Sequence, residues 1–394
     1  MTRESADVVV IGAGSTGSSI AWQLAVRGAG TVLLLDKGAV GSGQTQWSSA
    51  QIRQHYTNET LSRMALRGLE FFEQFEERVG VPAAFNQTGL LVLVTPQDYE
   101  ALAFNVEMQQ SIGIDTTLVD VDAIAGIAPG IAVDEHTYAA WEPRSGYCDP
   151  LEVTRAYAKA AQREGVELRE GVEVRRLVVE NDRVTGVETA AGVIDTDSVV
   201  VATGYRAIDL AAPLGIDIPF TPIRHSVCVL DHPAGFGAQH PIVSDRIAGS
   251  YYRPTGAHQT LIGTTAAEEG VLDPEVEIVR KPPAADIDEL TRRAIARFPA
   301  MAGATLAHSH TGTYDCTPDV QPILGSANDI DGLHLAVGMS GHGFKLAPIV
   351  AEMVACDVLD TPHPEFDITF FEFSRFHEGR AIVSLRPYSV GTLG

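Results

Sequence analysis

A glycine-rich turn near the N-terminus limits what this chain can fold into. Residues 12–17 read GAGSTG, a GxGxxG pattern that lies between the apolar run VVVI and a stretch with apolar residues at helical spacing. Gly12 permits a tight turn, Gly14 lets the backbone approach a pyrophosphate, and Gly17 lets the helix pack closely on the strand. The N-terminus of that helix offers free N–H groups to phosphates. The arrangement predicts a dinucleotide site.

A second strand supports this interpretation. Residues 31–36, TVLLLD, follow the predicted helix and end in Asp36. A carboxylate at this position accepts hydrogen bonds from a ribose diol, whereas an arginine would suggest a 2′-phosphate. The motif alone does not decide which dinucleotide is bound.

The remaining pattern indicates a second sheet that interrupts the first. Residues 90–94, LLVLV, are strand-like, and residues 218–270 alternate with Pro and Gly punctuation. We expect a fold of the α/β plus α+β class, with a Rossmann-type cofactor domain and a mainly antiparallel-sheet substrate domain. The cofactor domain is expected from residues 1–84, 150–217 and 322–394, and the substrate domain from 85–149 and 218–321.

Composition restricts the partners and the location. Acidic residues number 51 against 28 basic ones, for a formal net charge of −23, and no basic run is present. Nucleic acid and anionic membrane surfaces are therefore not expected as partners. No apolar stretch reaches the length of a membrane span, and the N-terminus does not read as a leader peptide.

The cysteines do not suggest a metal site or a disulfide framework. Cys148, Cys228, Cys316 and Cys356 are widely spaced and form no CxxC pair. We therefore expect no metal, and we expect a reducing, cytoplasmic location.

Four segments of the chain carry a family resemblance. They are the GAGSTG turn with Asp36, the segment GSGQTQWSSAQIR at 41–53, the strand DSVVVATG at 197–204, and a C-terminal pair, TGTYDCTPDVQPILG at 311–325 with GMSGHGFKLAP at 338–348. Together they resemble the D-amino-acid oxidase and sarcosine oxidase superfamily of FAD enzymes, which includes glycine oxidase. The resemblance covers nearly the whole chain and implies FAD as the cofactor of the discontinuous domain.

The expected FAD contacts lie in these segments. GHGFK resembles the segment that closes over the flavin ring in sarcosine oxidases. Its glycines allow the backbone to approach a flat ring, and the helix that follows can stabilise negative charge on a reduced flavin. The candidate cofactor-binding residues are Gly12, Gly14, Ser15, Thr16, Gly17, Asp36, Lys37, Ser42, Gly43, Thr45, Ser48, Ser49, Val174, Ala202, Thr203, Gly204, Gly341, His342, Gly343, Phe344 and Lys345.

Two cations match the carboxylate-binding pair of the sarcosine oxidases. These are Arg53 in AQIR and Lys345 in GHGFK, and a cation in a water-poor pocket holds a carboxylate well. Tyr314 falls where the family places a pocket-lining tyrosine. Adjacent strand residues face opposite ways, so only one of Tyr251 and Tyr252 can face the substrate. We take Arg53, Lys345, Tyr314 and Tyr251 as the candidate catalytic residues.

The chain also departs from the family pattern. Gly312 occupies the position of the cysteine that links FAD in monomeric sarcosine oxidases, so we expect noncovalent FAD. Cys148-Asp149 replaces the His-Asp pair that links FMN in heterotetrameric sarcosine oxidases. Leu261 aligns with the lysine that assists the reaction with oxygen, so oxygen and another electron acceptor both remain open. Arg253 is a second candidate carboxylate anchor.

The expected activity is FAD-dependent oxidation of the CH–NH group of a small carboxylated amine. N-methyl amino acids such as sarcosine, proline, glycine and opines all remain admissible, and a homo- or hetero-oligomer is possible. An alternative is a flavin-bearing subunit that passes electrons to partner chains. A third interpretation is an FAD protein whose amine site has decayed, which an intact Arg53 and Lys345 argue against.

Overall fold

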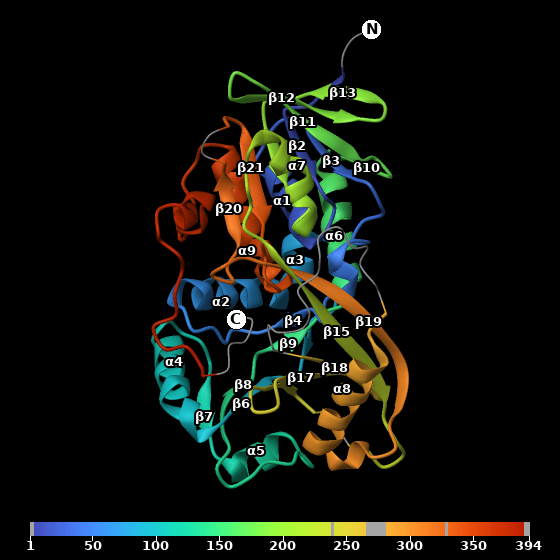
Figure 1. Ribbon diagram of the computed structural model, residues 1–394, viewed down its shortest axis with the longest axis vertical. Helices are drawn as coiled ribbons and strands as arrows, with labels where there is room; N and C mark the ends of the chain where they lie inside the picture. Colours follow the sequence, from blue (N-terminus) through green and yellow to red (C-terminus); the bar gives the residue numbers. More distant parts are fainter. Residues whose placement is uncertain (1–3, 238–239, 265–280, 328–329, 390–394) are drawn as a thin grey trace.

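The computed structural model describes residues 4–237, 240–264, 281–327 and 330–389. Its upper half in Figure 1 is built on a six-stranded sheet with the order β10-β3-β2-β14-β21-β20. All neighbouring strands in this sheet are parallel except β20 and β21. These strands are β10 (Glu167–Glu170), β3 (Val32–Asp36), β2 (Val8–Ile11), β14 (Val199–Val201), β21 (Leu333–Val337) and β20 (Ile323–Ser326).

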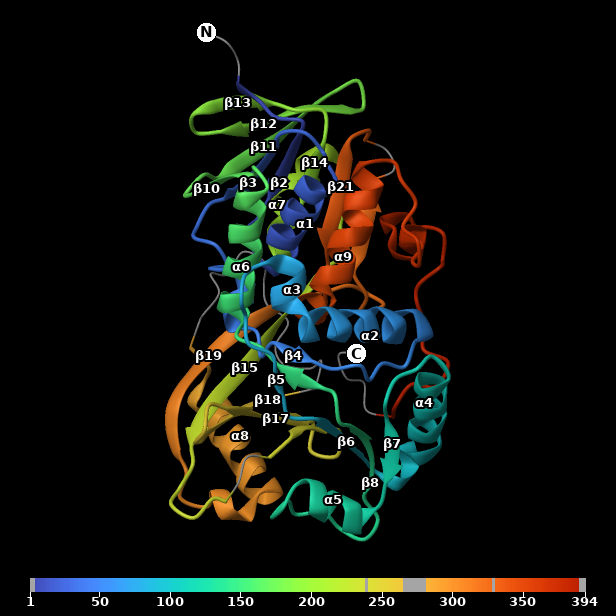
Figure 2. The ribbon, with the colours of Figure 1, turned by 180° about the vertical axis from the view of Figure 1, so that it is seen from behind.

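Both faces of this sheet are covered, which explains why its strands are continuously apolar. Val8 and Val10 point into a core with the helices on one face, and Val9 and Ile11 point into the core on the other face. Helix α1 packs between α6 and α9, the three helices seen in Figure 2. The other face carries helix α7 (Ala207–Ala211) and a sheet with the order β1-β13-β12-β11.

The lower half contains an eight-stranded mixed sheet with the order β19-β15-β18-β17-β16-β6-β8-β7. LLVLV forms β6 of this second sheet, as the sequence predicts. Helix α2 lies between the two halves in both views, and it contacts α9. The strands are β19 (Thr305–Cys316), β15 (Thr221–Asp231), β18 (Gln259–Thr264), β17 (Ser250–Thr255), β16 (Ile242–Asp245), β6 (Leu90–Val94), β8 (Tyr138–Glu142) and β7 (Thr117–Val119).

Shorter strands and the helices complete the fold. The remaining strands are β1 (Glu4–Ser5), β4 (Gln51–Ile52), β5 (Asn86–Gln87), β9 (Gly146–Tyr147), β11 (Val174–Glu180), β12 (Arg183–Thr189) and β13 (Gly192–Asp195). The other helices are α1 (Ser15–Val26), α2 (Glu59–Glu73), α3 (Phe75–Val79), α4 (Tyr99–Ser111), α5 (Val121–Ile127), α6 (Pro150–Arg163), α8 (Ala284–Arg297) and α9 (Gly343–Val358). No helix among the described residues is both long and apolar enough to cross a membrane.

One predicted helix is divided in the structure. The sequence suggests a single helix over 60–80, but the chain forms α2 and α3 with a break at Gln74, where φ is −112° and ψ is 22°. The rings of Phe72 and Phe75 flank this break and stack with their centroids 5.9 Å apart. Both rings belong to the same core cluster, so the buried face of α2 continues across the break into α3.

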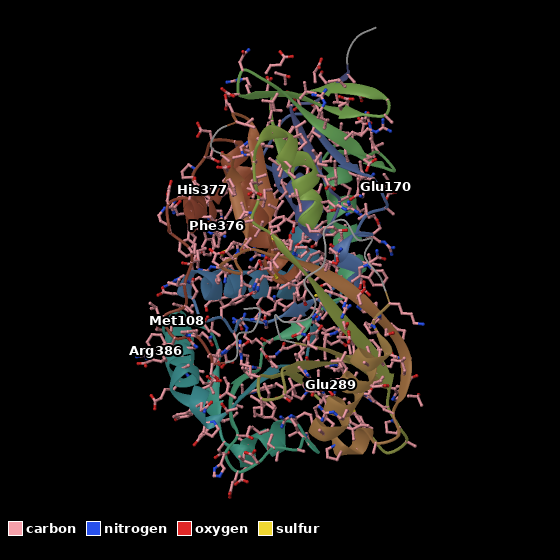
Figure 3. The ribbon with its side chains drawn as sticks, in the orientation of Figure 1. Met108, Glu170, Glu289, Phe376, His377 and Arg386 are labelled. Atoms are coloured by element: carbon pink, nitrogen blue, oxygen red, sulfur yellow. The ribbon has the colours of Figure 1, made fainter. Side chains whose placement is uncertain are left out.

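The chain returns to the lower half after α9. Arg375 is fully buried and donates from Nε and Nη2 to the two carboxylate oxygens of Asp319, at 2.8 and 2.9 Å. The segment then runs down to α4 (Figure 1). Figure 3 shows Arg386 beside Met108 of that helix, and the side chain of Asn105 donates to the backbone carbonyl of Arg386 at 3.3 Å.

Candidate functional site

The glycine turn between β2 and α1 has the shape that a close ligand approach requires. Gly12 has φ of +104°, and a Cβ atom there would lie 2.5 Å from the carbonyl oxygen of Ala202. A Cβ atom on Gly17 would lie 1.8 Å from the carbonyl oxygen of Gly12. Only glycine fits either position, so the turn stays close to the ends of β2 and β14.

The acid at the end of β3 is oriented by the same turn. Asp36 accepts a hydrogen bond from the backbone N–H of Ala13 at 2.6 Å and another from Gly38 at 2.7 Å. The hydroxyl of Thr45 accepts from the N–H of Ser15 at 3.1 Å, which ties the 3-10 helix Gln44–Trp47 to the start of α1. Carboxylate oxygens retain further lone pairs, so Asp36 can still accept from a hydroxyl.

Most of the predicted cofactor residues lie around the glycine turn and the adjoining strand ends, whereas Lys37 and Val174 lie outside this group. The buried Oγ1 of Thr203, just after β14, has no hydrogen-bond partner in the described part of the chain, and is therefore suited to a ligand. Lys37 is exposed, and Val174 begins β11 on the face of the sheet opposite α1, α6 and α9. Around the turn and the ends of β2, β3 and β14 lie Gly12, Gly14, Ser15, Thr16, Gly17, Asp36, Ser42, Gly43, Thr45, Ala202, Thr203 and Gly204.

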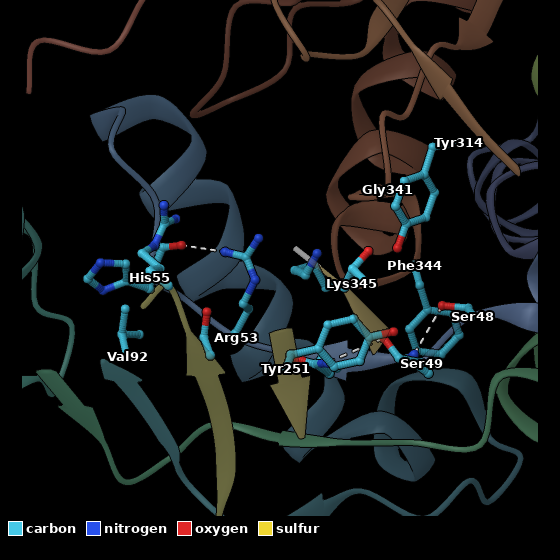
Figure 4. Close-up of a pocket in the computed structure, with 15 residues that line it drawn as sticks. Ser48, Ser49, Arg53, His55, Val92, Tyr251, Tyr314, Gly341, Phe344 and Lys345 are labelled. Atoms are coloured by element: carbon cyan, nitrogen blue, oxygen red, sulfur yellow. Dashed lines mark hydrogen bonds between the residues drawn. The ribbon is translucent and has the colours of Figure 1, made fainter. Parts of the chain in front are cut away.

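A second group of predicted residues surrounds a pocket between the two halves. Ser48 and Ser49 line this pocket from one side, and Gly341, Phe344 and Lys345 line it from the start of α9 (Figure 4). The full lining is Ser48, Ser49, Ala50, Gln51, Arg53, His55, Val92, Ser244, Arg246, Tyr251, Thr264, Tyr314, Gly341, Phe344 and Lys345. All four predicted catalytic residues are in this set.

The loop before α9 brings backbone close to an aromatic ring. Gly341 has φ of +84°, and a Cβ atom there would lie 3.3 to 3.4 Å from the ring of Tyr314. His342 and Gly343 follow, and α9 begins at Gly343. Gly68 of α2 would place a Cβ atom 2.6 Å from the carbonyl oxygen of Lys345, so a glycine here lets α2 and α9 approach closely. This crossing fixes Lys345 at the edge of the pocket.

Tyr56 holds the two predicted anchoring cations on one ring. The guanidinium carbon of Arg53 lies 4.6 Å from the ring centroid and the Nζ atom of Lys345 lies 5.8 Å from it. The hydroxyl of Tyr56 is 3.0 Å from Nδ1 of His342, and Arg53 donates to the backbone carbonyl of His55. Burial raises the pKa of Tyr56 to about 12, so this ring is neutral at physiological pH.

Burial also places Lys345 in an electrostatically unfavourable position. It lowers the pKa of the ammonium group well below the ordinary lysine value, and the charge of Arg53 lowers it further. A carboxylate bound between the two side chains would stabilise the charged form of Lys345. The site is therefore suited to an anionic ligand.

An aromatic wall forms the opposite side of the pocket. Tyr251 and Tyr314 both line it, and His225 stacks on each of them, with ring centroids 5.7 Å and 4.7 Å away. Nε2 of His225 is 3.0 Å from the hydroxyl of Tyr251. Tyr252 points to the other face and donates to the carbonyl of Arg293 at 3.2 Å. Only one of the adjacent tyrosines faces the pocket, as the strand alternation predicts.

Some residues of the site carry no clear signal in the sequence. Arg246, His55 and Ser244 line the pocket, although none belongs to a motif that we identified. Arg253, the second candidate anchor, is not among the lining residues, and its guanidinium lies 4.3 Å from the ring centroid of Tyr147. Among the described residues, the cationic side chains that line the pocket are Arg53, Lys345 and Arg246.

A buried acid under the Gly341 loop makes stability depend on pH. The carboxylate of Asp315 accepts from the backbone N–H of Ser340 at 3.2 Å, and burial raises its pKa to about 6. The raised pKa means that the folded state favours the protonated form of Asp315. The stability that this form contributes is fully present below the unfolded-state pKa near 3.8, and it is lost as pH rises through about 6.

We expect Asp315→Asn to remove this dependence, because the amide oxygen can still accept from Ser340 and the side chain cannot ionise. The difference in unfolding free energy between variant and wild type should shift in favour of the variant by up to about 3 kcal/mol between pH 4 and pH 7. Thermal unfolding of both proteins with equal FAD across that range measures it. If the unfolding free energies of the wild type and of Asp315→Asn changed with pH in parallel, the raised pKa of Asp315 would be contradicted.

The geometry defines a dinucleotide-binding fold with a pocket between its two halves, and comparison with known proteins agrees with the fold. The family model described as FAD dependent oxidoreductase matches residues 7–356, and the chain belongs to this family. The cofactor is therefore FAD. The turn, Asp36 and the Thr203 hydroxyl, which has no hydrogen-bond partner among the described residues, fit such a ligand, and the glycine loop before α9 gives a flat ring close access to backbone.

The names of two curated relatives describe oxidases of compounds that contain an amine. The chain is 27% identical over 93% of its length to the 4-methylaminobutanoate oxidase (formaldehyde-forming) of Paenarthrobacter nicotinovorans, of which it covers 45%. It is also 27% identical to the glycine oxidase of Pseudomonas putida, covering 92% of this chain and 97% of that protein. The chain spans about half the length of the first curated relatives it matches.

A solved structure is similar over the whole chain. The L-proline dehydrogenase from P. horikoshii is 30% identical, with a TM-score of 0.88, and the match covers 97% of this chain and 100% of that one. The predicted fold, a Rossmann-type FAD domain with a mainly antiparallel second sheet, is confirmed by this similarity and by the observed sheets.

Proposed function

We propose that this protein oxidises the CH–NH group of a small amine that carries a carboxylate. The observation that supports this most directly is the pairing of Arg53 and Lys345 on Tyr56 at a pocket whose other end is the Gly341 loop. The compounds named for the relatives, 4-methylaminobutanoate, glycine and L-proline, each contain an amine and a carboxylate. The division into a cofactor domain and a substrate domain at the boundaries given above is part of this proposal.

Different residues of the pocket bind the carboxylate, enclose the amine and position the tyrosines. The chemistry that FAD would supply when bound is acceptance of the hydride equivalent that leaves the carbon next to the substrate nitrogen. Arg53 and Lys345 hold the carboxylate, which fixes the distance of the C–H bond from the glycine loop. Tyr251 and Tyr314 enclose the amine and exclude water, and His225 holds Tyr251 by its hydroxyl. Burial lowers the pKa of His225 to about 3, so its ring is neutral and adds no charge against a cationic amine.

Noncovalent attachment of FAD belongs to the same proposal. Gly312 has no side chain that can form a link, and a Cβ atom there would lie 3.6 Å from Trp47. The nearby Cys316 is buried, and burial raises the pKa of its thiol to about 12, which suppresses the reactive thiolate.

Anaerobic reduction of the flavin tests the proposed function. We expect sarcosine, proline or another small carboxylated amine to bleach the yellow protein, whereas the same amine with its carboxylate converted to an amide should be at least about 100-fold slower. Stopped-flow absorbance of the purified chain measures the rates. Flavin that is bound but reduced by none of these amines would reject the proposal.

The same experiment, repeated with a dye as the electron acceptor, separates an independent enzyme from a subunit. Turnover by the isolated chain indicates that it works without partner chains. Flavin reduction without turnover by dye or oxygen indicates that electrons leave through a partner.

A further inference from the structure

A tyrosine from the C-terminal segment supports the end of the pocket that lies opposite the glycine loop. Figure 4 shows His55 at this end, Gly341 at the other end and Arg53 between them. Nε2 of His55 lies 2.6 Å from the hydroxyl of Tyr388, and the two rings stack with their centroids 6.0 Å apart. Tyr388 is not among the described residues that line the pocket, so its ring forms a second layer behind His55.

Both rings of this wall are buried. His55 is 2% exposed and Tyr388 is 8% exposed. The family model matches residues 7–356, so His55 lies inside the matched region and Tyr388 lies beyond it. The second layer of the wall is therefore a feature that the family motifs do not describe.

The backbone around Tyr388 is tied to helix α4 and to the residue before it. The N–H and the hydroxyl of Ser389 donate to the two carboxylate oxygens of Asp98 at 2.7 and 2.9 Å. The carbonyl of Arg386 accepts from the side chain of Asn105 at 3.3 Å. Asp98 and Asn105 are both buried. These hydrogen bonds, from residues on both sides of Tyr388, fix the place of its ring.

The other ring nitrogen of His55 faces a buried carboxylate. Nδ1 lies 3.5 Å from Oε1 of Glu142, which is fully buried, and Oε2 of Glu142 accepts from the hydroxyl of Ser145 at 2.7 Å. Negative charge at this position favours the tautomer with its proton on Nδ1, so Nε2 accepts from the hydroxyl of Tyr388. Glu142 and Tyr388 together orient the His55 ring.

The order of residues along the pocket gives this wall a consequence for the substrate. A carboxylate held by Arg53 and Lys345 leaves the amine toward the glycine loop, and a side chain that points the other way meets His55. The His55 ring can yield to a large side chain only if it gives up its hydrogen bond and its stacking contact with Tyr388.

We propose that Tyr388 is a positioning residue that fixes His55 as the size-limiting wall of the substrate pocket, so that amino acids with a long side chain are excluded. This inference rests on the proposed function and adds a limit on size to its substrate class. Tyr388 acts through His55 and needs no contact with the substrate.

Pairs of substrates that differ only in their side chain test the wall. The pairs are sarcosine with racemic N-methylleucine, glycine with racemic leucine, and proline with 4-phenylproline, and the pair with the fastest small member is used. We expect the wild type to favour the small member by at least about 100-fold in the ratio of reduction rate to dissociation constant. Anaerobic stopped-flow reduction of the flavin measures both constants.

Variants of the two rings show whether the preference depends on them. Tyr388→Ala and His55→Ala should each reduce the preference at least about tenfold, through tighter binding of the large member, and the double variant should add little to either. Tyr388→Phe keeps the ring and should keep most of the preference. Tyr138→Ala is the matched control, because this tyrosine of β8 is 38% exposed, and it should leave the preference unchanged.

The outcomes separate this inference from the proposed function. A wild type that reduces with both members equally well, or an unchanged preference in both alanine variants with FAD bound, would overturn the size-limiting wall and leave the proposed function standing. Equal losses for small and large members in Tyr388→Ala would also overturn it, because the residue would then be only structural. If Tyr388→Ala lost its fold by thermal midpoint, His55→Ala would decide. Failure of every small member to reduce bound flavin would reject both proposals.

Discussion

Replacing Lys345 by Met is expected to lower kcat/KM for a carboxylated amine by about 100- to 1,000-fold, mostly through a higher KM. The ammonium group is buried on the Tyr56 ring beside Arg53, and methionine fills a similar volume without charge. Loss of the cation leaves the substrate carboxylate with one partner in a pocket where water competes poorly. Steady-state rates with FAD content measured in parallel provide the readout.

The matched control for Lys345→Met is the same substitution at an exposed lysine. Lys159 is exposed on α6, and Lys159→Met should change neither KM nor flavin content measurably. Arg53→Met should resemble Lys345→Met, and the two losses should not add fully, because both cations hold one carboxylate. If Lys345→Met lost flavin and activity in equal proportion, the residue would be structural and carboxylate binding would have to lie elsewhere.

Replacing Gly12 by Ala should nearly abolish FAD retention, leaving less than about a tenth of the wild-type flavin after purification. Alanine disfavours the φ of +104°, and its Cβ atom would lie 2.5 Å from the carbonyl oxygen of Ala202. The backbone must therefore move at the turn where the pyrophosphate is expected. The ratio of flavin to protein absorbance measures the loss.

Gly28→Ala separates this effect from backbone strain alone. Gly28 also has positive φ, +77°, but no atom lies within 4 Å of a Cβ atom built there. We expect a cost of about 1–2 kcal/mol in stability with flavin content near that of the wild type. Comparable flavin loss in both variants would mean that strain, and not the close approach at the turn, controls FAD binding.

Much of the fold could be predicted because short stretches of the sequence specify its turns, strands and helices. The GAGSTG turn, the apolar runs of β2 and β6, the helical spacing of α1 and the helix expected after GHGFK all appear in the structure. Asn181 and Asp182 adopt positive φ in the β11–β12 hairpin, as their turn propensity suggests. The break at Gln74 escaped prediction, since residues 60–80 contain no proline that would mark the end of a helix.

The site was only partly predictable for a related reason. Arg53, Lys345, Tyr251 and Tyr314 were found because they lie in or beside recognisable segments, and the structure brings them to one pocket. Tyr56, His55 and Arg246 take their roles from neighbours far away in sequence. His55 meets Tyr388, 333 positions further along the chain, and no periodicity or motif encodes such a meeting.

The contact between His55 and Tyr388 has a practical consequence for handling the protein. Tyr388 follows the buried Arg375 anchor in the C-terminal segment, and its hydroxyl contacts His55, which lines the pocket. A variant truncated after residue 385 would therefore lose the ring that supports His55, while the flavin turn would stay intact. Selectivity among amines would change in such a preparation even though its yellow colour did not.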